Sequence, residues 1–149
     1  SEDVAQARVA FDARMKTIQA RPTAVKMVEE LRLPLQSGSI FARHYHPAPQ
    51  KKLPMVIFYH GGAFMVGGLD SHDEFCRRLV VHAKAQVLSV ADPLTPECSP
   101  LQMVQVCEDA LAWAHQHRKQ IKVYKNRIAL AGDSAGGNLA TVVAQRSVG

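Results

Sequence analysis

The chain has 149 residues, 47% of them hydrophobic, which predicts a globular domain with a sizeable core. Its formal net charge is +5, but the basic residues are scattered and do not interleave with aromatic ones, which disfavours a nucleic-acid-binding protein. The sequence contains no run of about 18 or more apolar residues, so no membrane-spanning helix is expected. The first residues lack the basic and apolar regions of a signal peptide. Three cysteines without CxxC spacing predict reduced thiols in a cytoplasmic protein, and neither a disulfide framework nor a zinc site.

The first elements are predicted to be a helix and a hairpin. Residues 4–19 carry apolar side chains at helical spacing, so we expect an amphipathic helix, serving either as an ordinary packing helix or as a cap over an apolar pocket. Residues 25–35 and 39–45 predict two strands joined by a turn at 36–38. His44 and His46 point the same way on the second strand. With no further ligands evident nearby, we expect surface histidines and no metal site.

Alternating strands and helices follow, predicted as a strand at 53–59, a helix at 71–82, a strand at 86–90, a helix at 99–117 and a strand at 128–131. Asp70 or Ser71 is the expected N-cap of the first of these helices. Ser99 and Gln102 predict a capping box for the second. The alternation predicts an α/β fold with a mostly parallel, doubly wound sheet after an antiparallel hairpin.

A G-x-S-x-G pattern lies between the strand at 128–131 and an apolar helical pattern that starts near Ala135. In this context Ser134 would stand at the tip of a strained turn, with its hydroxyl in solvent, as a nucleophile does. Small glycines on either side allow the backbone segments to approach closely. The alternative interpretation is an ordinary glycine-rich turn with an exposed serine.

A second glycine-rich segment, His60-Gly-Gly-Ala-Phe, directly follows the buried strand at 53–59. The carboxyl ends of parallel strands lie at one edge of a sheet, so this loop and the serine turn should be neighbours. Its backbone N–H groups, with that of Ala135, could form an oxyanion hole. The alternatives are a flexible loop or a phosphate-binding loop, but neither GxxxxGK[ST] nor GxGxxG fits.

Three segments, H-G-G-A-F at 60–64, L-T-P-E at 94–97 and G-D-S-A-G-G-N-L-A at 132–140, resemble the hormone-sensitive-lipase-like branch of the α/β-hydrolase esterases. The resemblance implies an α/β-hydrolase fold and a serine carboxylesterase or lipase-like hydrolase that needs no metal or organic cofactor. It also implies an N-terminal cap helix region at 1–22, followed by the N-terminal half of a hydrolase domain at 23–149.

By this resemblance Ser134 is the nucleophile. The N–H groups of the oxyanion hole would come from Gly62, Ala63 and Ala135. Gly61 would set the turn of the loop, His60 would support the loop without acting as the base, and Asp133 would be structural. This chain departs from the family pattern in two places: Ala63 replaces a third glycine, and the family's D-Y-R reads Ala-Asp-Pro at 91–93, which removes a side-chain anchor near the oxyanion loop.

The acid and the histidine of a triad would normally follow the serine in the chain, but no Asp, Glu or His follows Ser134. Among earlier histidines, His72 is predicted at the correct edge of the sheet and is an unfavoured candidate base, whereas His115 and His117 should lie at the opposite edge. A hydrolase of this type is about twice as long, so we expect the front half of a fold. Its last strand would then be bare and prone to aggregate or to pair with a second chain or copy.

The expected function is therefore the hydrolysis of carboxylic esters with an uncharged, short to medium acyl group. The apolar residues 64–66 of the oxyanion loop favour such a substrate. The alternative is a non-catalytic ligand-binding or interaction protein on the same fold. Plant gibberellin receptors are similar relatives that keep the serine region without a complete triad.

Overall fold

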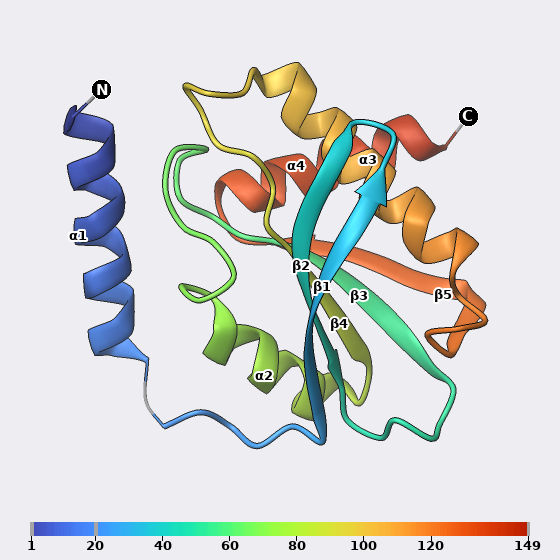
Figure 1. The fold of residues 1–149 in the computed structure, drawn as a ribbon. Helices are drawn as coiled ribbons and strands as arrows, with labels where there is room; N and C mark the ends of the chain where they lie inside the picture. The colour runs from blue at the N-terminus through green and yellow to red at the C-terminus, as the bar shows by residue number, and fades with distance from the viewer. Residues whose placement is uncertain (1, 20, 149) are drawn as a thin grey trace.

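The computed structural model describes residues 2–19 and 21–148. Their elements, in chain order, are α1 (Glu2–Ile18), β1 (Met27–Leu35), β2 (Gly38–His46), β3 (Leu53–Tyr59), α2 (Asp73–Ala83), β4 (Gln86–Val90), α3 (Pro100–Gln116), β5 (Val123–Gly132) and α4 (Ala135–Ser147) (Figure 1). Each predicted helix and strand is present. The last strand starts earlier than predicted because Val123 pairs with Leu53 before a register shift, and the regular pairing begins at Ile128 opposite Met55.

The five strands form one mixed sheet in the order β1-β2-β4-β3-β5. β1 and β2 pair as the predicted antiparallel hairpin, and β2 pairs antiparallel with β4. β3 is parallel to both β4 and β5, so these three strands end at the same edge of the sheet. The α/β-hydrolase fold expected from the sequence places its functional loops at that edge.

Helices cover both faces of the sheet, with α2 on one face and α3 and α4 on the other (Figure 1). The position of β3 between the two helical layers explains why its sequence is continuously apolar. Its Ile57 and Tyr59 belong to the core cluster shared with α3 and α4, whereas Phe58 belongs to the cluster shared with α2. A strand buried on both faces needs apolar residues at every position.

α3 begins as predicted. The Ser99 hydroxyl accepts a hydrogen bond from Gln102 N, and the Gln102 side chain accepts one from Ser99 N, which completes the capping box. Pro100 occupies the start of the helix, where its missing N–H has no intrahelical partner to lose.

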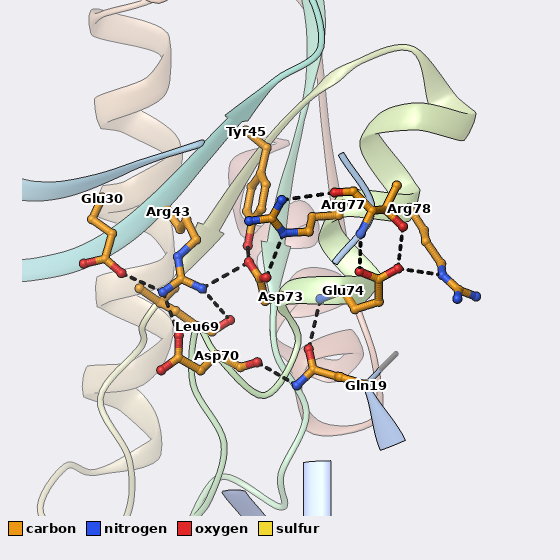
Figure 2. A network of polar contacts seen from close by, with 11 residues as sticks. Gln19, Glu30, Arg43, Tyr45, Leu69, Asp70, Asp73, Glu74, Arg77 and Arg78 are labelled. Atoms are coloured by element: carbon orange, nitrogen blue, oxygen red, sulfur yellow. Dashed lines mark hydrogen bonds and ion pairs between the residues drawn. The ribbon is translucent and has the colours of Figure 1, made fainter. Parts of the chain in front are cut away.

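The predicted N-cap of α2 was wrong. The helix begins at Asp73 with His72 in the cap position, and no side-chain hydrogen bond caps it. The Asp70 carboxylate accepts a 2.7 Å hydrogen bond from Arg43 (Figure 2). The Ser71 hydroxyl forms hydrogen bonds with the backbone of Gly68 and with the His72 ring. Asp70 is therefore engaged by a tertiary contact, and Ser71 by hydrogen bonds to residues close to it in the sequence.

A polar network surrounds the start of α2 (Figure 2). The Asp73 carboxylate accepts hydrogen bonds from Tyr45 (2.6 Å), Arg77 (2.8 Å) and Arg43 (3.1 Å). Burial alone would raise the pKa of Asp73, but the hydrogen bonds from Tyr45 and Arg77 and the two positive charges hold it below its usual value. The network fixes α2 against the hairpin.

The expectation that His44 and His46 lie on the surface was also wrong, because they are only 5% and 3% exposed. The first residues of β2 are exposed, but its last five residues are all buried, and four of these pair with β4. His44 Nε2 lies 2.7 Å from Gln86 Oε1, and burial lowers the pKa of both histidines. Across the described ranges, no group of three or more His, Cys, Asp or Glu side chains could hold a metal ion.

α1 stands apart from the sheet (Figure 1) and contains no buried residue. Phe11 and Met15 of its predicted apolar face are half-buried, but Ile18 is 65% exposed. Among the helices of the described residues, none is both long and apolar enough to cross a membrane.

Candidate active site

The G-x-S-x-G segment forms the predicted turn between a strand and a helix. β5 ends at Gly132 and α4 begins at Ala135. Between them Ser134 has φ 50° and ψ −116°, and it is exposed. A residue with a side chain adopts a positive φ at a cost of about 1–3 kcal/mol, and such strain is concentrated at functional sites.

The glycines of this turn allow backbone segments to touch. A Cβ on Gly136 would collide with the carbonyl of Tyr59 at the end of β3, and a Cβ on Gly132 would collide with Gly136. The start of α4 therefore lies directly against the carboxyl end of β3. Ala135 is buried at this helix start, where the first N–H groups have no intrahelical partner.

The glycine-rich loop after β3 forms a compact turn. The carbonyl oxygen of Gly62 accepts hydrogen bonds from Met65 N and Val66 N, both at 3.0 Å. Ala63 and Phe64 follow with φ values of 52° and 62°, both in the left-handed region. Ala63, which stands where the family has a third glycine, thus occupies a conformation that glycine adopts more easily.

The two loops lie at the same edge of the sheet, as expected, and Asp133 joins them. Gly61 N donates a 2.7 Å hydrogen bond to Asp133 Oδ1, and Gly136 N donates a 2.8 Å bond to the Asp133 carbonyl oxygen. The residue before Ser134 therefore positions the glycine loop and the helix start at once.

His60 is buried beneath the glycine loop. Its Nδ1 lies 2.9 Å from the carbonyl oxygen of Gly61. Its Nε2 lies 3.2 Å from Asp92 Oδ1, but the two buried atoms do not form a hydrogen bond. Burial raises the pKa of Asp92, and a positive charge on His60 would lower it.

Sequence reasoning missed Asp92. The replacement of D-Y-R by residues 91–93 is expected to remove an anchor, and the sequence alone did not reveal that the Asp92 carboxylate lies 3.2 Å from His60. The available signal was a charged residue just after β4, a strand whose residues are all buried. At the carboxyl end of a parallel strand, such a residue faces the loops of the site.

The structure does not bring His72 to Ser134 as a base. His72 Nε2 lies 3.2 Å from both carboxylate oxygens of Asp133, and its Nδ1 lies 2.8 Å from the Ser71 hydroxyl. Burial lowers the pKa of His72, although the Asp133 charge opposes this. Within the described residues no hydrogen bond joins His72 to Ser134, so this histidine supports the turn through Asp133.

The sequence is similar to that of known hydrolases. A family model of the alpha/beta hydrolase fold matches residues 56–148. The chain is 42% identical over 119 residues to the carboxylic ester hydrolase LipN of Mycobacterium tuberculosis, covering 79% of this chain and 32% of LipN. It is 37% identical over 138 residues to the esterase LipI of the same organism, covering 90% of this chain and 43% of LipI.

Solved structures show the same likeness. An esterase of Pyrobaculum calidifontis superposes with a TM-score of 0.93 at 36% identity, covering 97% of this chain and 47% of that esterase. The thermostable carboxylesterase EstE1, from a metagenomic library, superposes with a TM-score of 0.88 at 36% identity, covering 98% of this chain and 49% of EstE1. The chain thus spans 32% to 49% of the length of these relatives.

Proposed function

The chain belongs to the alpha/beta hydrolase fold family, and from this premise we propose that it carries the nucleophile and the oxyanion hole of a carboxylic-ester hydrolase. The observation that carries the proposal is the exposed Ser134 in a strained turn, joined through Asp133 to the glycine loop. Relatives named as carboxylic ester hydrolases and esterases support the reaction class.

In the proposed reaction, Ser134 Oγ attacks the ester carbonyl carbon. The N–H groups of Gly62, Ala63 and Ala135 stabilise the negative oxygen that develops, each contributing about 3 kcal/mol. A histidine base takes the proton of the Ser134 hydroxyl and passes it to the leaving alcohol. Water, activated by the same base, then hydrolyses the acyl-enzyme and restores the serine hydroxyl. We assign that histidine and its acid partner to polypeptide outside these 149 residues, because His72 is engaged by Asp133.

Two residues would hold the proposed oxyanion loop in place. Gly61 sets its first turn, and a Cβ there would meet the Asp133 carboxylate. His60 supports the loop through the Gly61 carbonyl oxygen and does not act as the base. Its burial beneath the loop, away from solvent, supports that assignment.

We propose an uncharged acyl group of short to medium length as the substrate moiety. The apolar part of a pocket of about 360 Å³ beside the serine turn supports this. Met15, Ile18 and Phe75 form that part, and polar and charged side chains, among them Glu74, Arg78 and Asp133, form the rest of the lining. The helix that supplies Met15 and Ile18 would belong to a cap region at 1–22, with the hydrolase part at 23–149. Ser1, Ala20 and Gly149 lie outside the described residues.

We also propose a cytoplasmic location, and further polypeptide that pairs with the outer strand β5. Cys76, Cys98 and Cys107 are all free thiols, which supports a reducing compartment. β5 is the outer strand of the described sheet and pairs only with β3 there, which supports further polypeptide, a second chain or a second copy beside it.

The test is covalent labelling with a fluorophosphonate, together with hydrolysis of a short-chain nitrophenyl ester, in the polypeptide expressed from its complete reading frame. We expect labelling and hydrolysis in the wild type, and loss of both in Ser134→Ala. Ser147→Ala is the matched control, because Ser147 is exposed at the far end of the same helix. A folded wild type that stays unlabelled would favour the alternative, a non-catalytic ligand-binding or interaction protein.

A further inference from the structure

One arginine of α1 connects three segments of the molecule. Arg8 Nε donates to the Met65 carbonyl oxygen (2.8 Å), and Nη2 donates to the Thr95 carbonyl oxygen (3.0 Å). Nη1 and Nη2 also form a paired contact with the two carboxylate oxygens of Glu97, at 2.7 and 2.8 Å. The guanidinium group therefore joins α1, the glycine loop and the loop that follows β4.

These contacts act on residues that directly follow the proposed oxyanion donors Gly62 and Ala63 in the sequence. The Phe64 carbonyl oxygen accepts hydrogen bonds from Thr95 N (2.8 Å) and Thr95 Oγ1 (3.1 Å). Arg8 in turn holds the Thr95 carbonyl oxygen and the Met65 carbonyl oxygen. The two peptide groups that follow Phe64 are thus fixed from outside the loop.

External fixing matters here because Ala63 and Phe64 are consecutive non-glycine residues with positive φ. Such a conformation persists only when the surrounding structure determines it. The turn within the loop closes at Gly62, and the contacts from Thr95 and Arg8 hold its far side.

We propose that Arg8 is a positioning residue that orients the N–H groups of Gly62 and Ala63 toward the oxyanion. This inference rests on the proposed function and deepens it. A planar guanidinium held by two parallel bonds to Glu97 has a fixed orientation, which a lysine ammonium cannot reproduce. The pair is partly exposed, with the side chains of Arg8 and Glu97 28% and 61% accessible, so its removal changes global stability little.

The other end of α1 has a separate polar anchor. Gln19 donates to the Asp70 carbonyl oxygen and accepts from Glu74 N, both at 3.0 Å (Figure 2). This anchor reaches the start of α2 and does not contact the glycine loop. Loosening α1 at Gln19 and releasing the glycine loop at Arg8 are therefore separable changes.

The experiment compares Arg8→Gln and Arg8→Lys with the control Arg14→Gln in the polypeptide of the complete reading frame. Arg14 lies on the exposed side of the same helix, and within the described residues its side chain makes no hydrogen bond or ion pair. We expect both Arg8 variants to lower kcat for a nitrophenyl ester, and the rate constant of fluorophosphonate labelling, by about tenfold, with KM nearly unchanged. Arg14→Gln should match the wild type.

Wild-type kcat and labelling rate in Arg8→Gln would overturn the inference, as would a change confined to KM or to the melting temperature. Glu97→Gln is the second variant, and we expect it to lower kcat and the labelling rate constant by less than Arg8→Gln does. If Arg8→Gln does not fold, Glu97→Gln provides the test. Gln19→Ala separates docking of α1 from positioning of the loop, and a loss there equal to that of Arg8→Gln would also refute the assignment. A wild type without activity or labelling would instead contradict the proposed function.

Discussion

His44 shows how a single buried residue links this fold to pH. In the unfolded chain its pKa is about 6.5, and burial on β2 lowers that value in the folded protein. Below pH 6.5 the unfolded state therefore binds more protons than the folded state, and stability falls as pH drops toward the folded pKa. We expect the free energy of unfolding in urea to be lower at pH 5.5 than at pH 7.5.

The variant His44→Gln tests the assignment, because glutamine can still bond to Gln86 but does not titrate. Its stability should change less between the two pH values than that of the wild type. His115→Gln is the control, since His115 is exposed at the end of α3. Equal pH slopes for the wild type and His44→Gln would show that the titrating group lies elsewhere.

At the scale of elements, the site depends on how closely α4 approaches the end of β3. Gly136→Ala would place a methyl group into the carbonyl of Tyr59, which requires the helix start to move. Overpacking of this kind costs about 2–3 kcal/mol, more than the helix propensity gained by alanine. We expect that loss in urea unfolding, together with weaker fluorophosphonate labelling of Ser134.

Two other glycines provide a graded control. A methyl group on Gly137 would lie 3.2 Å from the Gly132 carbonyl oxygen and would meet no other residue closely, so Gly137→Ala should have a small effect. Gly68 has open space around it, so Gly68→Ala should be close to neutral. If Gly68→Ala and Gly136→Ala destabilised the protein equally, close approach would not be the reason for the glycine.

At the scale of the whole molecule, the open side of the sheet is the main feature. A groove of about 1000 Å³ lies beside β5, between the last strand and helices α3 and α4, and its lining includes Ile128, Leu130 and Leu111. An outer strand with apolar neighbours is a template for pairing with another chain. We expect residues 1–149, produced alone, to self-associate with rising concentration in sedimentation velocity experiments.

A charge on the edge should suppress that association. Ala129→Lys introduces one at an exposed position of β5, and Ala10→Lys introduces the same change at an exposed position of α1. The first variant should shift the distribution toward monomer, and the second should not. A wild-type chain that remained monomeric at every concentration would contradict the expectation.

The features that depend only on residues close together in the sequence could be predicted from the sequence. The turn at Ser134, the capping box at Ser99 and the hairpin of β1 and β2 were all predictable. Each is set by glycine geometry, by a three-residue capping distance or by the side-chain period of a strand or helix. The common location of the glycine loop and the serine turn, at the carboxyl ends of β3 and β5, was also predictable, because both segments follow parallel strands.

Tertiary structure decided which distant residues meet. The burial of His44 follows from the pairing of this part of β2 with β4 and from the contact with Gln86, which the periodicity of β2 does not reveal. The contacts of Asp92 with His60, and of Arg8 with Glu97, join segments far apart in the chain. Periodicity indicates only which face of an element is apolar. These contacts depend instead on the order of the strands, and on the paths of the loops that follow the strands at their carboxyl ends.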